Sequence, residues 1–492
     1  MIYNFNLGIG WASSGVEYAQ IYRARMFRNI GVDAKFVFTD MFPQENIEHM
    51  TKNIGFEDSE VIWLYTFFTD FKTAPVTYTL SDLEKTFSNT EYTKSREGKI
   101  CRYVFNGNNF YTAYMVNDHD DYVHRVEMVS GGCLIRKDYF TYGRVYSEYY
   151  APLDNAAHLY HRRFFNVDGS IAYEEMIDDD RVMYKFKDKI LCSKEEFVGY
   201  MVSQLNLTSD DVILIDRSTD IGQSILMNCK PAKVGTVVHA DHFSEKETNE
   251  DYILWNNYYE YEFNMHKHID FYICSTQVQS DLMIQQFEKY YGMTPCVYTI
   301  PVGSLPELKY PKEGRKPFSL ITASRLASEK HVDWICKAVI QARSEVPELS
   351  LDIYGVGGER EKLENIIKEN NASSYIRLMG QHDLSEVYQN YEAYIAGSTS
   401  EGFGLTLMEA VGGGLPIIGF DVRYGNPTFI RDGENGYLMT LPEEDKDRVE
   451  ALRKGIVDLF KQDLEHCHSV SYEVAGDFLT SSVQEKWREA VC

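Results

Sequence analysis

Residues 393–420 read "AYIAGSTSEGFGLTLMEAVGGGLPIIGF" and contain one complete strand–helix–strand unit. The segments 393–397 and 415–420 are apolar throughout, as parallel strands are when helices cover both faces of their sheet. Between them, the run "LTLMEA" at 405–410 opens a predicted helix just after a glycine-flanked aromatic residue. A strand, a helix and a second apolar strand in succession predict a parallel α/β sheet.

The C-terminal half repeats this unit, because apolar strand-sized and helix-sized segments alternate along it. Strands are expected at 318–322, 349–355 and 375–380, and helices at 332–343, 359–369 and 384–390. We therefore expect a Rossmann-like domain over residues 305–475, after a linker at 303–316 that is rich in Pro, Gly and charge. A helix within 476–492 is expected to pack back on the N-terminal domain.

The N-terminal half begins and ends with the same alternation of strands and helices. Parallel strands are expected at 2–7, 34–39, 60–68, 211–216, 233–239, 269–275 and 296–302. The first Rossmann-like domain is therefore expected to comprise residues 1–72 and 193–304, and residues 73–192 interrupt it.

The interruption consists of short aromatic and β-branched runs, such as "HLYHRRFF" at 158–165. Turn signals separate these runs at Asn106-Gly107, Gly131-Gly132 and Asp168-Gly169. At 181–190 the sequence "RVMYKFKDKI" has a period of two, which places one face of a strand in a core. Because the segment is far too long for a loop, we expect an antiparallel β-meander inserted as a folded domain.

The overall composition excludes several classes of function. Among 492 residues, 49 basic and 74 acidic side chains give a net charge of −25, so no broad nucleic-acid or anionic-membrane surface is expected. The chain has no signal-peptide pattern and no run of about 20 apolar residues, which predicts a cytoplasmic protein without an integral membrane segment. Its nine cysteines are scattered and never form CxxC pairs, which predicts reduced thiols and no zinc site.

Candidate site residues follow the predicted strands of the C-terminal domain. In parallel sheets, ligands bind beyond the carboxyl ends of the strands, where helix N-termini gather N–H groups. The loop "ASRLASEK" at 323–330 places Arg325 and Lys330 after one such strand. A single Arg often pairs only with surface acids, but two cations at one strand end of an acidic protein indicate a ligand with two or more negative charges.

The stretch "STSEGFGLT" at 398–406 follows another strand. The glycines that flank Phe403 permit close backbone approach at the start of the next helix. We therefore expect the N–H groups of Gly404, Leu405 and Thr406 to meet phosphate or hydroxyl oxygens.

Two carboxylates frame this stretch. Glu401 and Glu409 are eight residues apart and are expected on nearly the same side of the helix, since eight residues turn through about 800°. Such acids are common at helix starts. Two side chains that only accept hydrogen bonds also suit a polyhydroxylated ligand, whose hydroxyl groups are donors. Together with the cations, they predict a site for a sugar and a ribose joined by a diphosphate.

The N-terminal half contains weaker sequence signals for a ligand site. The loop "GIGWASSG" at 8–15 is rich in glycine and serine, and it places Ser14 and Gly15 in a second candidate anion loop. It matches neither GxGxxG nor a Walker P-loop. His239 ends a predicted strand and His242 follows it; a lone histidine is usually structural, but the carboxyl end of a strand suits a functional one.

Arg325 and Lys330 form an R-x4-K pattern, and Glu401 and Glu409 form an E-x7-E pattern. The set resembles the signature of the retaining family-four glycosyltransferases, whose GT-B fold has two Rossmann-like domains that face a cleft and clamp a nucleotide-sugar. More narrowly, the GtfA-type catalytic subunits of the accessory-secretion glycosyltransferases of Gram-positive bacteria are similar in "LGIGWASSGVEYAQ", "TDIGQ", "VVHADHFS", "LWNNYYEYEF" and "STSEGFGLTLMEAVGGGLPIIGFDVRYGN". The resemblance spans most of the chain, the aromatic meander included.

The resemblance implies roles for the residues of the C-terminal domain. Arg325 and Lys330 would hold the donor diphosphate and stabilise the leaving nucleotide. Glu401 would contact the sugar hydroxyls, and the N–H groups after Phe403 would bind the sugar or a phosphate. Glu409 would accept hydrogen bonds from the ribose.

It also implies roles for residues at the rim of this site. Gln381 and His382 would receive the uracil, and His239 would lie beside the transferring sugar. Gly15, with Ser14 before it, would complete the diphosphate site.

The activity implied is transfer of N-acetylglucosamine from UDP-GlcNAc to serine or threonine hydroxyls of serine-rich repeat adhesins. A related, catalytically defective partner subunit (GtfB-like) would help to hold the acceptor. Peripheral association of the complex with the inner face of the membrane stays open. The residues do not decide between N-acetylglucosamine, glucose and xylose as the donor sugar, and a non-protein acceptor also stays open.

The sequence lacks several features that other mechanisms and other functions would require. The retaining enzymes that the chain resembles show no clear carboxylate nucleophile, and this sequence offers no better one, so a front-face substitution is favoured over Glu401 as a covalent nucleophile. The "DHD" at 118–120 imitates a metal motif but lies in a predicted turn, and Arg325 with Lys330 can neutralise the diphosphate, so neither a metal nor another cofactor is expected. An epimerase would need acid/base groups on both faces of the sugar, and a non-catalytic partner subunit would lack the cationic pair and Glu401.

The aromatic strands of the insertion predict a binding face. So thin a sheet cannot hide all of its tyrosine and phenylalanine rings, and exposed aromatic surface usually marks an interface. We expect residues 73–192 to join the equivalent sheet of the partner by edge pairing or face packing, and to help form a groove for the acceptor polypeptide. The alternative is a module that only caps the N-terminal domain.

Overall fold

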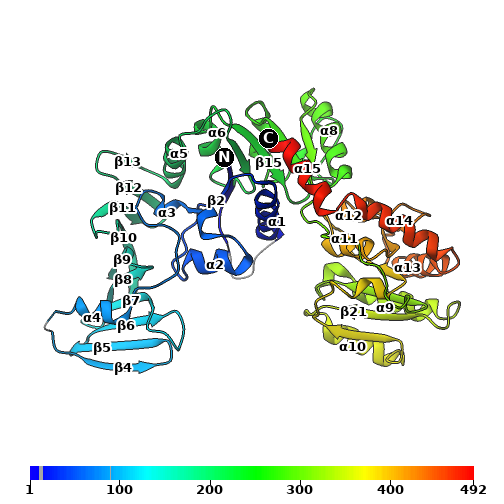
Figure 1. Ribbon diagram of the computed structural model, residues 1–492, viewed down its shortest axis with the longest axis horizontal. Helices are drawn as coiled ribbons and strands as arrows, with labels where there is room; N and C mark the ends of the chain where they lie inside the picture. The colour runs from blue at the N-terminus through cyan, green and yellow to red at the C-terminus, as the bar shows by residue number, and fades with distance from the viewer. Residues whose placement is uncertain (10–14, 89) are drawn as a thin grey trace. The chain divides into compact units, whose positions relative to one another are not determined.

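The computed structural model describes residues 1–9, 15–88 and 90–492 (Figure 1). The chain divides into two compact units. The first comprises Met1–Ala24, Val32–Thr236 and Asn257–Asp270, and the second comprises Arg25–Gly31, Val237–Asn256 and Phe271–Cys492. The domain boundaries expected from the sequence differ from this division and stay predictions.

The first unit contains parallel strands in the order β15-β14-β1-β2-β3. Ile2 lies opposite both Ala34 of β2 and Val212 of β14, so the first strand of the chain lies between two neighbours. Phe5 and Ile213 are fully buried, as expected of strands in a covered parallel sheet. The strands are β1 (Ile2–Asn6), β2 (Ala34–Phe38), β3 (Val61–Trp63), β14 (Val212–Ile215) and β15 (Lys233–Val238). The helices that begin in this unit are α1 (Gly15–Ile30), α2 (Ile47–Ile54), α3 (Leu64–Phe67), α4 (Leu80–Lys85), α5 (Lys194–Gln204), α6 (Gly222–Asn228) and α7 (Glu260–Asn264).

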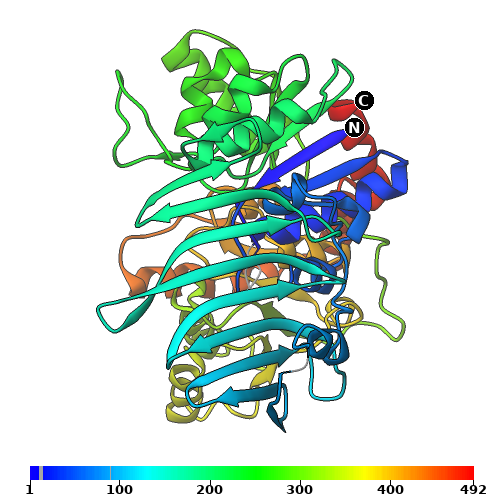
Figure 2. The same cartoon turned by 90° about the vertical axis from the view of Figure 1, so that its left-hand side faces the viewer.

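The inserted segment is a ten-stranded antiparallel sheet in which each strand pairs with the next one along the chain, which confirms the predicted meander (Figure 2). Gly107 and Gly169 have φ values of 48° and 84° in two of its turns, as the turn signals predict. The strands are β4 (Thr93–Glu97), β5 (Ile100–Asn106), β6 (Asn109–Met115), β7 (Val123–Ser130), β8 (Cys133–Phe140), β9 (Arg144–Leu153), β10 (Ala156–Phe165), β11 (Ile171–Asp178), β12 (Arg181–Lys185) and β13 (Ile190–Leu191).

Stacked aromatic rings form much of the core of this sheet. Tyr139, Tyr146, Phe164 and Tyr173 come from four successive strands, and their ring centroids are 4.3, 5.5 and 4.5 Å apart. The hydroxyl of Tyr173 donates to the carbonyl oxygen of Tyr65 at 2.7 Å, so this part of the sheet shares a core with α3. Other large side chains of the insertion stay exposed, among them Tyr122, Ile135, Leu153, Tyr160 and Ile190.

One predicted strand is shorter than expected. The segment 60–68 is β3 followed by the short helix α3, because the hydroxyls of Thr66 and Thr69 each donate to a carbonyl oxygen three residues earlier. Tyr65 in α3 stacks on Phe164 of the meander with centroids 5.7 Å apart. Packing between distant segments overrides the strand preference of this aromatic run.

The second unit contains a six-stranded parallel sheet in the order β22-β21-β20-β23-β24-β25, which confirms the second Rossmann-like sheet. Every residue of β20, β23 and β24 is buried, as their apolar sequences predict. The strands are β20 (Ser319–Ala323), β21 (Ser350–Tyr354), β22 (Ile376–Gly380), β23 (Ala393–Ile395), β24 (Ile417–Phe420) and β25 (Gly436–Met439). The helices are α9 (Val332–Ala342), α10 (Arg360–Glu369), α11 (Leu405–Gly412), α12 (Gly425–Phe429), α13 (Asp445–Leu459), α14 (Leu464–Gly476) and α15 (Thr480–Val491).

Further elements complete this unit. The parallel strands β18 (Phe271–Cys274) and β19 (Val297–Thr299) flank α8 (Gln277–Tyr291), and β16 (Phe243–Ser244) pairs with β17 (Leu254–Trp255). The last helix, α15, contacts β19, and the ring of Trp487 meets that of Phe27 edge-on at 5.2 Å.

The segment 384–390 is not the expected helix. The N–H groups of Val387 and Asn390 each donate to a carbonyl oxygen three residues earlier, and only one tight turn forms, at Tyr388–Asn390. Asp383 accepts a hydrogen bond from the N–H of Ser385 at 3.0 Å and so competes with helical pairing. Within the ranges that the structure describes, no helix is long and apolar enough to cross a membrane.

Candidate functional site

The loops that follow β20 and β23 approach each other closely. A Cβ atom on Gly397 would lie 2.8 Å from the carbonyl oxygen of His331 and 3.0 Å from that of Lys330, so this position admits only glycine without a shift of the backbone. The close approach brings the cationic loop after β20 beside the glutamate loop after β23. Both loops lie at the carboxyl ends of parallel strands, where ligand sites of such sheets are found.

Lys330 and Glu401 form an ion pair at the centre of this arrangement. The Nζ atom of Lys330 is 2.6 Å from Oε2 of Glu401, and each side chain retains only 20% of its exposure. The backbone of Glu401 is fixed as well, since its carbonyl oxygen accepts from the N–H groups of Tyr424 at 2.6 Å and Gly425 at 2.7 Å. The structure therefore joins two residues that the sequence places 71 positions apart.

Arg325 lies outside this pair. Its side chain is 79% exposed, and its Nη2 atom is 3.1 Å from Oε1 of Glu329. A second glycine contact fixes the loop that carries it: a Cβ atom on Gly355 would lie 1.9 Å from the carbonyl oxygen of Ser324. The guanidinium thus stands on a fixed loop, and among the described residues it is held only by a surface ion pair, which is easily exchanged for a ligand.

The helix α11 begins directly after the glutamate loop. Gly404 precedes the helix with a φ of 88°, and its carbonyl oxygen accepts from the N–H groups of Leu407 and Met408. Among the described residues, no acceptor meets the N–H groups of Leu405 and Thr406. Two aligned donors at a positive helix end can bind an anionic or hydroxyl oxygen.

The side chains around this helix start are part of the core. The ring of Phe403 is buried against Phe429 and Phe478, at centroid distances of 5.3 and 6.0 Å, so only its backbone can face a ligand. The hydroxyl of Thr406 accepts from that of Tyr394 at 3.1 Å.

Glu409 occupies the second turn of α11, and its expected place on the same side as Glu401 stays a prediction. Glu401 precedes the helix by four residues, and the left-handed Gly404 breaks the helical rotation between the two carboxylates. The carboxylate of Glu409 accepts from the hydroxyl of Tyr388 at 3.0 Å. Burial, and to a lesser extent the charge of Asp383, raise the pKa of Glu409 above its usual value, while the hydrogen bond from Tyr388 opposes the shift.

Gln381 and His382 follow β22 as exposed residues. The Nε2 atom of His382 is 2.8 Å from the carbonyl oxygen of Met379, and its ring meets Tyr354 edge-on with centroids 5.8 Å apart. The two side chains are accessible at a strand end, and their expected contact with a base stays a prediction.

His239 lies beside the glutamate loop. A Cβ atom on Gly402 would be 3.9 Å from the carbonyl oxygen of His239. His242, three residues on, is fully buried, and its Nδ1 atom is 3.2 Å from the hydroxyl of Tyr424. Burial lowers the pKa of His242 to about 4, so it acts as a neutral packing and hydrogen-bonding group.

Sequence reasoning missed the residues that hold Glu401 in place. A Cβ atom on Gly425 would lie 2.9 Å from Cγ of Glu401 and 2.3 Å from the carbonyl oxygen of Phe403. Tyr424 links this backbone contact to the buried His242. The stretch "RYGN" at 423–426 was visible in the sequence, but nothing in its pattern shows which loop it meets.

The remaining predicted site residues are less defined. Gly15 is the exposed first residue of α1, and Ser14 lies outside the described residues. The turn at 118–120 is held by Asn117, whose side-chain oxygen accepts from the N–H groups of His119 and Asp120 at 2.8 Å. Among the residues with described positions, no three His, Cys, Asp or Glu side chains gather as metal ligands. The expectation of no metal stays a prediction.

Comparisons with known proteins agree along the whole chain. Residues 93–188 match the family described as GtfA extended beta-sheet domain, and residues 308–474 match Glycosyl transferases group 1. The UDP-N-acetylglucosamine–peptide N-acetylglucosaminyltransferase GtfA subunit of Streptococcus agalactiae is 54% identical over 99% of this chain and 97% of its own length.

Solved structures of GtfA proteins are similar to this chain as well. A chain of a GtfA/B complex superposes with a TM-score of 0.96 at 52% identity, covering 100% of this chain and 99% of that one. The pneumococcal O-GlcNAc transferase GtfA, in complex with UDP and GlcNAc, superposes with a TM-score of 0.85 at 50% identity, covering 100% and 98%. TarM shares the fold at a TM-score of 0.72 and 17% identity. The protein therefore belongs to the family of GtfA subunits of UDP-N-acetylglucosamine–peptide N-acetylglucosaminyltransferases.

Proposed function

We propose that this chain is a retaining glycosyltransferase that transfers N-acetylglucosamine from UDP-GlcNAc to serine or threonine hydroxyls of a serine-rich repeat polypeptide. The observation that carries the proposal is the Lys330–Glu401 pair at 2.6 Å, beside the open N-terminus of α11. A cation, a carboxylate and two free N–H groups complement a diphosphate joined to a hydroxylated sugar. A non-catalytic relative has no need of this set.

Each residue has a task in this proposal. Lys330 leaves Glu401 in part to contact the diphosphate, and Arg325 exchanges Glu329 for it. Glu401 then accepts from a sugar hydroxyl, and the N–H groups of Leu405 and Thr406 bind a phosphate or sugar oxygen. Glu409 accepts from the ribose.

The contacts at the rim are proposed on the resemblance. Gln381 and His382 receive the uracil, His239 lies beside the sugar, and Ser14 and Gly15 complete the diphosphate site.

The chemistry proposed is a front-face substitution. The bond between the anomeric carbon and the diphosphate oxygen breaks while the acceptor oxygen approaches on the same face, which retains the configuration. The departing diphosphate oxygen takes the proton of the acceptor hydroxyl, so no carboxylate has to act as a nucleophile. Two cations stabilise the charge that develops on the leaving group, and this is where an enzyme of this type gains most of its rate.

The donor sugar is tested with a panel of UDP-sugars. We expect the fastest UDP release with UDP-GlcNAc, both in slow hydrolysis and in transfer to a serine-rich peptide. UDP-glucose tests the alternative donor, and the Lys330→Ala variant controls for contaminating hydrolases. Faster turnover with UDP-glucose than with UDP-GlcNAc would refute the donor assignment.

We propose that no metal takes part, because Arg325 and Lys330 supply two positive charges to the diphosphate. Treatment with EDTA, followed by removal of the chelator, should leave the rate of UDP release unchanged. Restoration of a lost rate by Mg²⁺ or Mn²⁺ would contradict this.

We further propose that the meander binds a related, non-catalytic GtfB-like subunit, with adhesin acceptors modified by the complex. The similar chain of a GtfA/B complex and the exposed side chains of the sheet support this. Leu153 and Tyr160 are 56% and 45% exposed, so glutamate at both positions should spare the fold and reduce copurification with the partner. Met227→Glu, at a 75% exposed position of α6, is the matched control. Full copurification by the double variant would argue against this face.

Peripheral attachment of the complex to the membrane is a further prediction of the resemblance. Fractionation of cells that contain both subunits tests it.

A further inference from the structure

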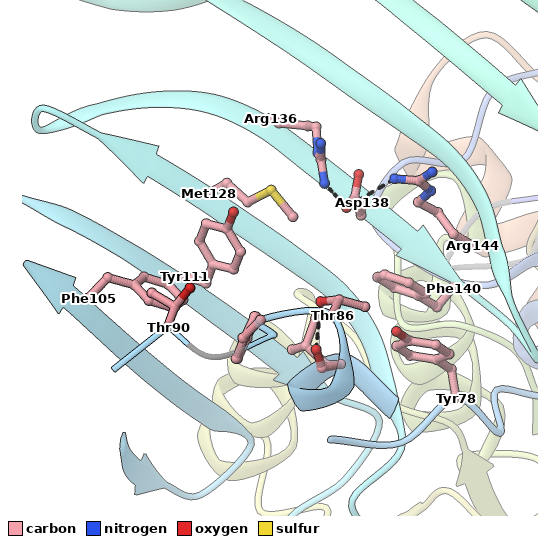
Figure 3. A pocket seen from close by; sticks show the side chains of 12 residues that line it. Tyr78, Thr86, Thr90, Phe105, Tyr111, Met128, Arg136, Asp138, Phe140 and Arg144 are labelled. Atoms are coloured by element: carbon pink, nitrogen blue, oxygen red, sulfur yellow. Dashed lines mark hydrogen bonds and ion pairs between the residues drawn. The ribbon is translucent and has the colours of Figure 1, made fainter. Parts of the chain in front are cut away.

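The inserted sheet contains a pocket of about 540 Å³ that the transfer reaction does not use (Figure 3). It lies between the sheet and the segment that carries α4. The capping box of Thr79 and Asp82 fixes the start of this helix, and the N–H of Tyr78 donates to the carbonyl oxygen of Thr141 at 2.9 Å. The volume falls within the range of about 300–1,000 Å³ that small-molecule sites occupy.

Aromatic rings form two walls of the pocket. Tyr78 stacks on Phe140 with centroids 4.2 Å apart, and Phe105 meets Tyr111 edge-on at 4.9 Å (Figure 3). Met128 supplies a further apolar surface. Such walls suit a ligand with a flat apolar face, which a free inorganic anion lacks.

The polar part of the pocket is rich in hydrogen-bond donors. Asp138 is buried and already engaged, since it accepts from Arg136 at 2.8 Å and from Ser147 at 2.5 Å. Arg144 reaches the same carboxylate only at 3.9 Å and is 34% exposed. The buried Nε atom of Arg136 has no acceptor within the described part of the chain. The carboxylate of Asp138 already has its hydrogen bonds, so N–H groups of the two guanidinium groups remain available to a ligand that carries acceptor atoms.

Two hydroxyl groups add to this donor set. Those of Tyr78 and Tyr111 have no hydrogen-bond partner among the residues that the structure covers. Burial, followed by the charges of Asp82 and Asp138, raises the pKa of Tyr78 to about 12, so its hydroxyl stays protonated at neutral pH. A ligand with both acceptor oxygens and an apolar face would satisfy the whole lining.

We propose that this pocket binds an N-acetylhexosamine unit already attached to the acceptor polypeptide. The C–H face of the pyranose ring packs on the aromatic walls, and the acetamido methyl packs near Met128. The acetamido carbonyl and the ring hydroxyls accept from Arg136, Arg144 and Tyr78. The inference rests on the proposed function, because that reaction makes the glycosylated chain; it adds a second, non-catalytic site that holds a modified segment.

The test measures binding of two synthetic peptides to the full chain by isothermal titration calorimetry. One serine-rich peptide carries a single α-linked N-acetylglucosamine, and the other is the same peptide without the sugar. A Lys330→Ala background weakens the contribution of the donor site. We expect the glycopeptide to bind at least about tenfold more tightly than the bare peptide, because the bare peptide cannot make the hydrogen bonds and ring contacts of the sugar.

The pocket variants are Arg144→Gln combined with Tyr111→Leu, and the milder Tyr78→Phe, which removes one hydroxyl and keeps the stacked ring. The first should lose at least about tenfold in glycopeptide affinity, and the second should lose a few-fold. Arg163→Gln is the control, because this arginine of β10 is 40% exposed and lies outside the pocket lining. Thermal unfolding checks that each variant folds.

The outcomes separate this inference from the proposed function. Unchanged glycopeptide affinity in folded pocket variants, or equal affinity for the bare peptide, would overturn the sugar site. The same pocket variants in an otherwise unmodified chain should hydrolyse UDP-GlcNAc at the normal rate. Absent hydrolysis in the unmodified chain, with glycopeptide binding intact, would overturn the proposed function and leave the pocket assignment supported.

Discussion

Replacing Lys330 by alanine removes a cation that is 2.6 Å from Glu401 and only 20% exposed. One charge-assisted contact to the diphosphate is worth about 1.5–3 kcal/mol, which is about one to two decades in kcat/KM. The variant also leaves Glu401 without its partner in a mostly buried position. We therefore expect a loss near the upper end, of about a hundredfold, together with a lower melting temperature, because a mostly buried carboxylate is left without its partner.

Arg325→Ala should lower kcat/KM less, by about tenfold. The 79% exposed side chain of Arg325 loses conformational freedom when it reaches the diphosphate, and this offsets part of the contact energy. The assay is steady-state UDP release from UDP-GlcNAc, with kcat and KM determined separately. Lys337→Ala is the control: this lysine of α9 is 44% exposed, pairs with Asp333 at 3.4 Å and lies outside the site.

A double-mutant cycle tests whether Lys330 and Glu401 act as a unit. Residues in contact usually couple by about 0.5–3 kcal/mol, so the double variant Lys330→Ala, Glu401→Gln should lose less than the sum of the single losses. Additive losses would refute a functional pair. Near-normal kcat/KM in both Lys330→Ala and Arg325→Ala would refute the diphosphate site itself.

Three further substitutions test the carboxylates. Glu401→Gln should lower kcat strongly with UDP affinity mostly retained; an equal loss of UDP affinity, measured by calorimetry, would make it a nucleotide contact. Glu409→Gln should weaken UDP binding. It should also raise the melting temperature at pH 7 and not at pH 4, because the pKa of Glu409 is raised in the folded protein. The protonated carboxyl is harmless below its ordinary pKa, and the folded protein loses stability as the pH rises through the raised pKa and the buried group ionises. Burial raises the pKa of Glu262 to about 7 from 4.5, so Glu262→Gln should gain up to about 3 kcal/mol above pH 7 and nothing at pH 4. A pH-independent melting difference would contradict either titration argument.

The regular part of the fold could be predicted because apolar periodicity is a local property. The fully buried strands β20, β23 and β24 consist mostly of apolar residues, and several of the meander turns carry glycine at positive φ. In or directly beside the two segments that differ, 60–68 and 384–390, threonine or aspartate side chains bond to nearby backbone groups. Such competition depends on tertiary context, which a pattern of apolar residues does not contain.

The site was predictable as a set of residues and not as a set of contacts. The motif spacing selects Lys330 and Glu401, but their ion pair depends on Gly397, whose missing side chain lets two loops meet. The hydrogen bond from Tyr388 to Glu409 joins residues 21 positions apart across a segment that has no regular helix. Pairings of this kind follow from packing between loops, and single-residue preferences say nothing about them.

The pairing of strands also sets an order in which this chain can fold as it leaves the ribosome. Each meander strand meets its neighbour within a short stretch, so this part can assemble early from local contacts. One edge of β1 stays unpaired until β14 has been synthesised, because Ile2 pairs with Val212. At about 5–20 residues per second, synthesis of the residues between them takes roughly 10 to 40 s. A stall in synthesis before residue 212 would therefore leave a finished meander tethered to a first strand with one edge open to association with other nascent chains.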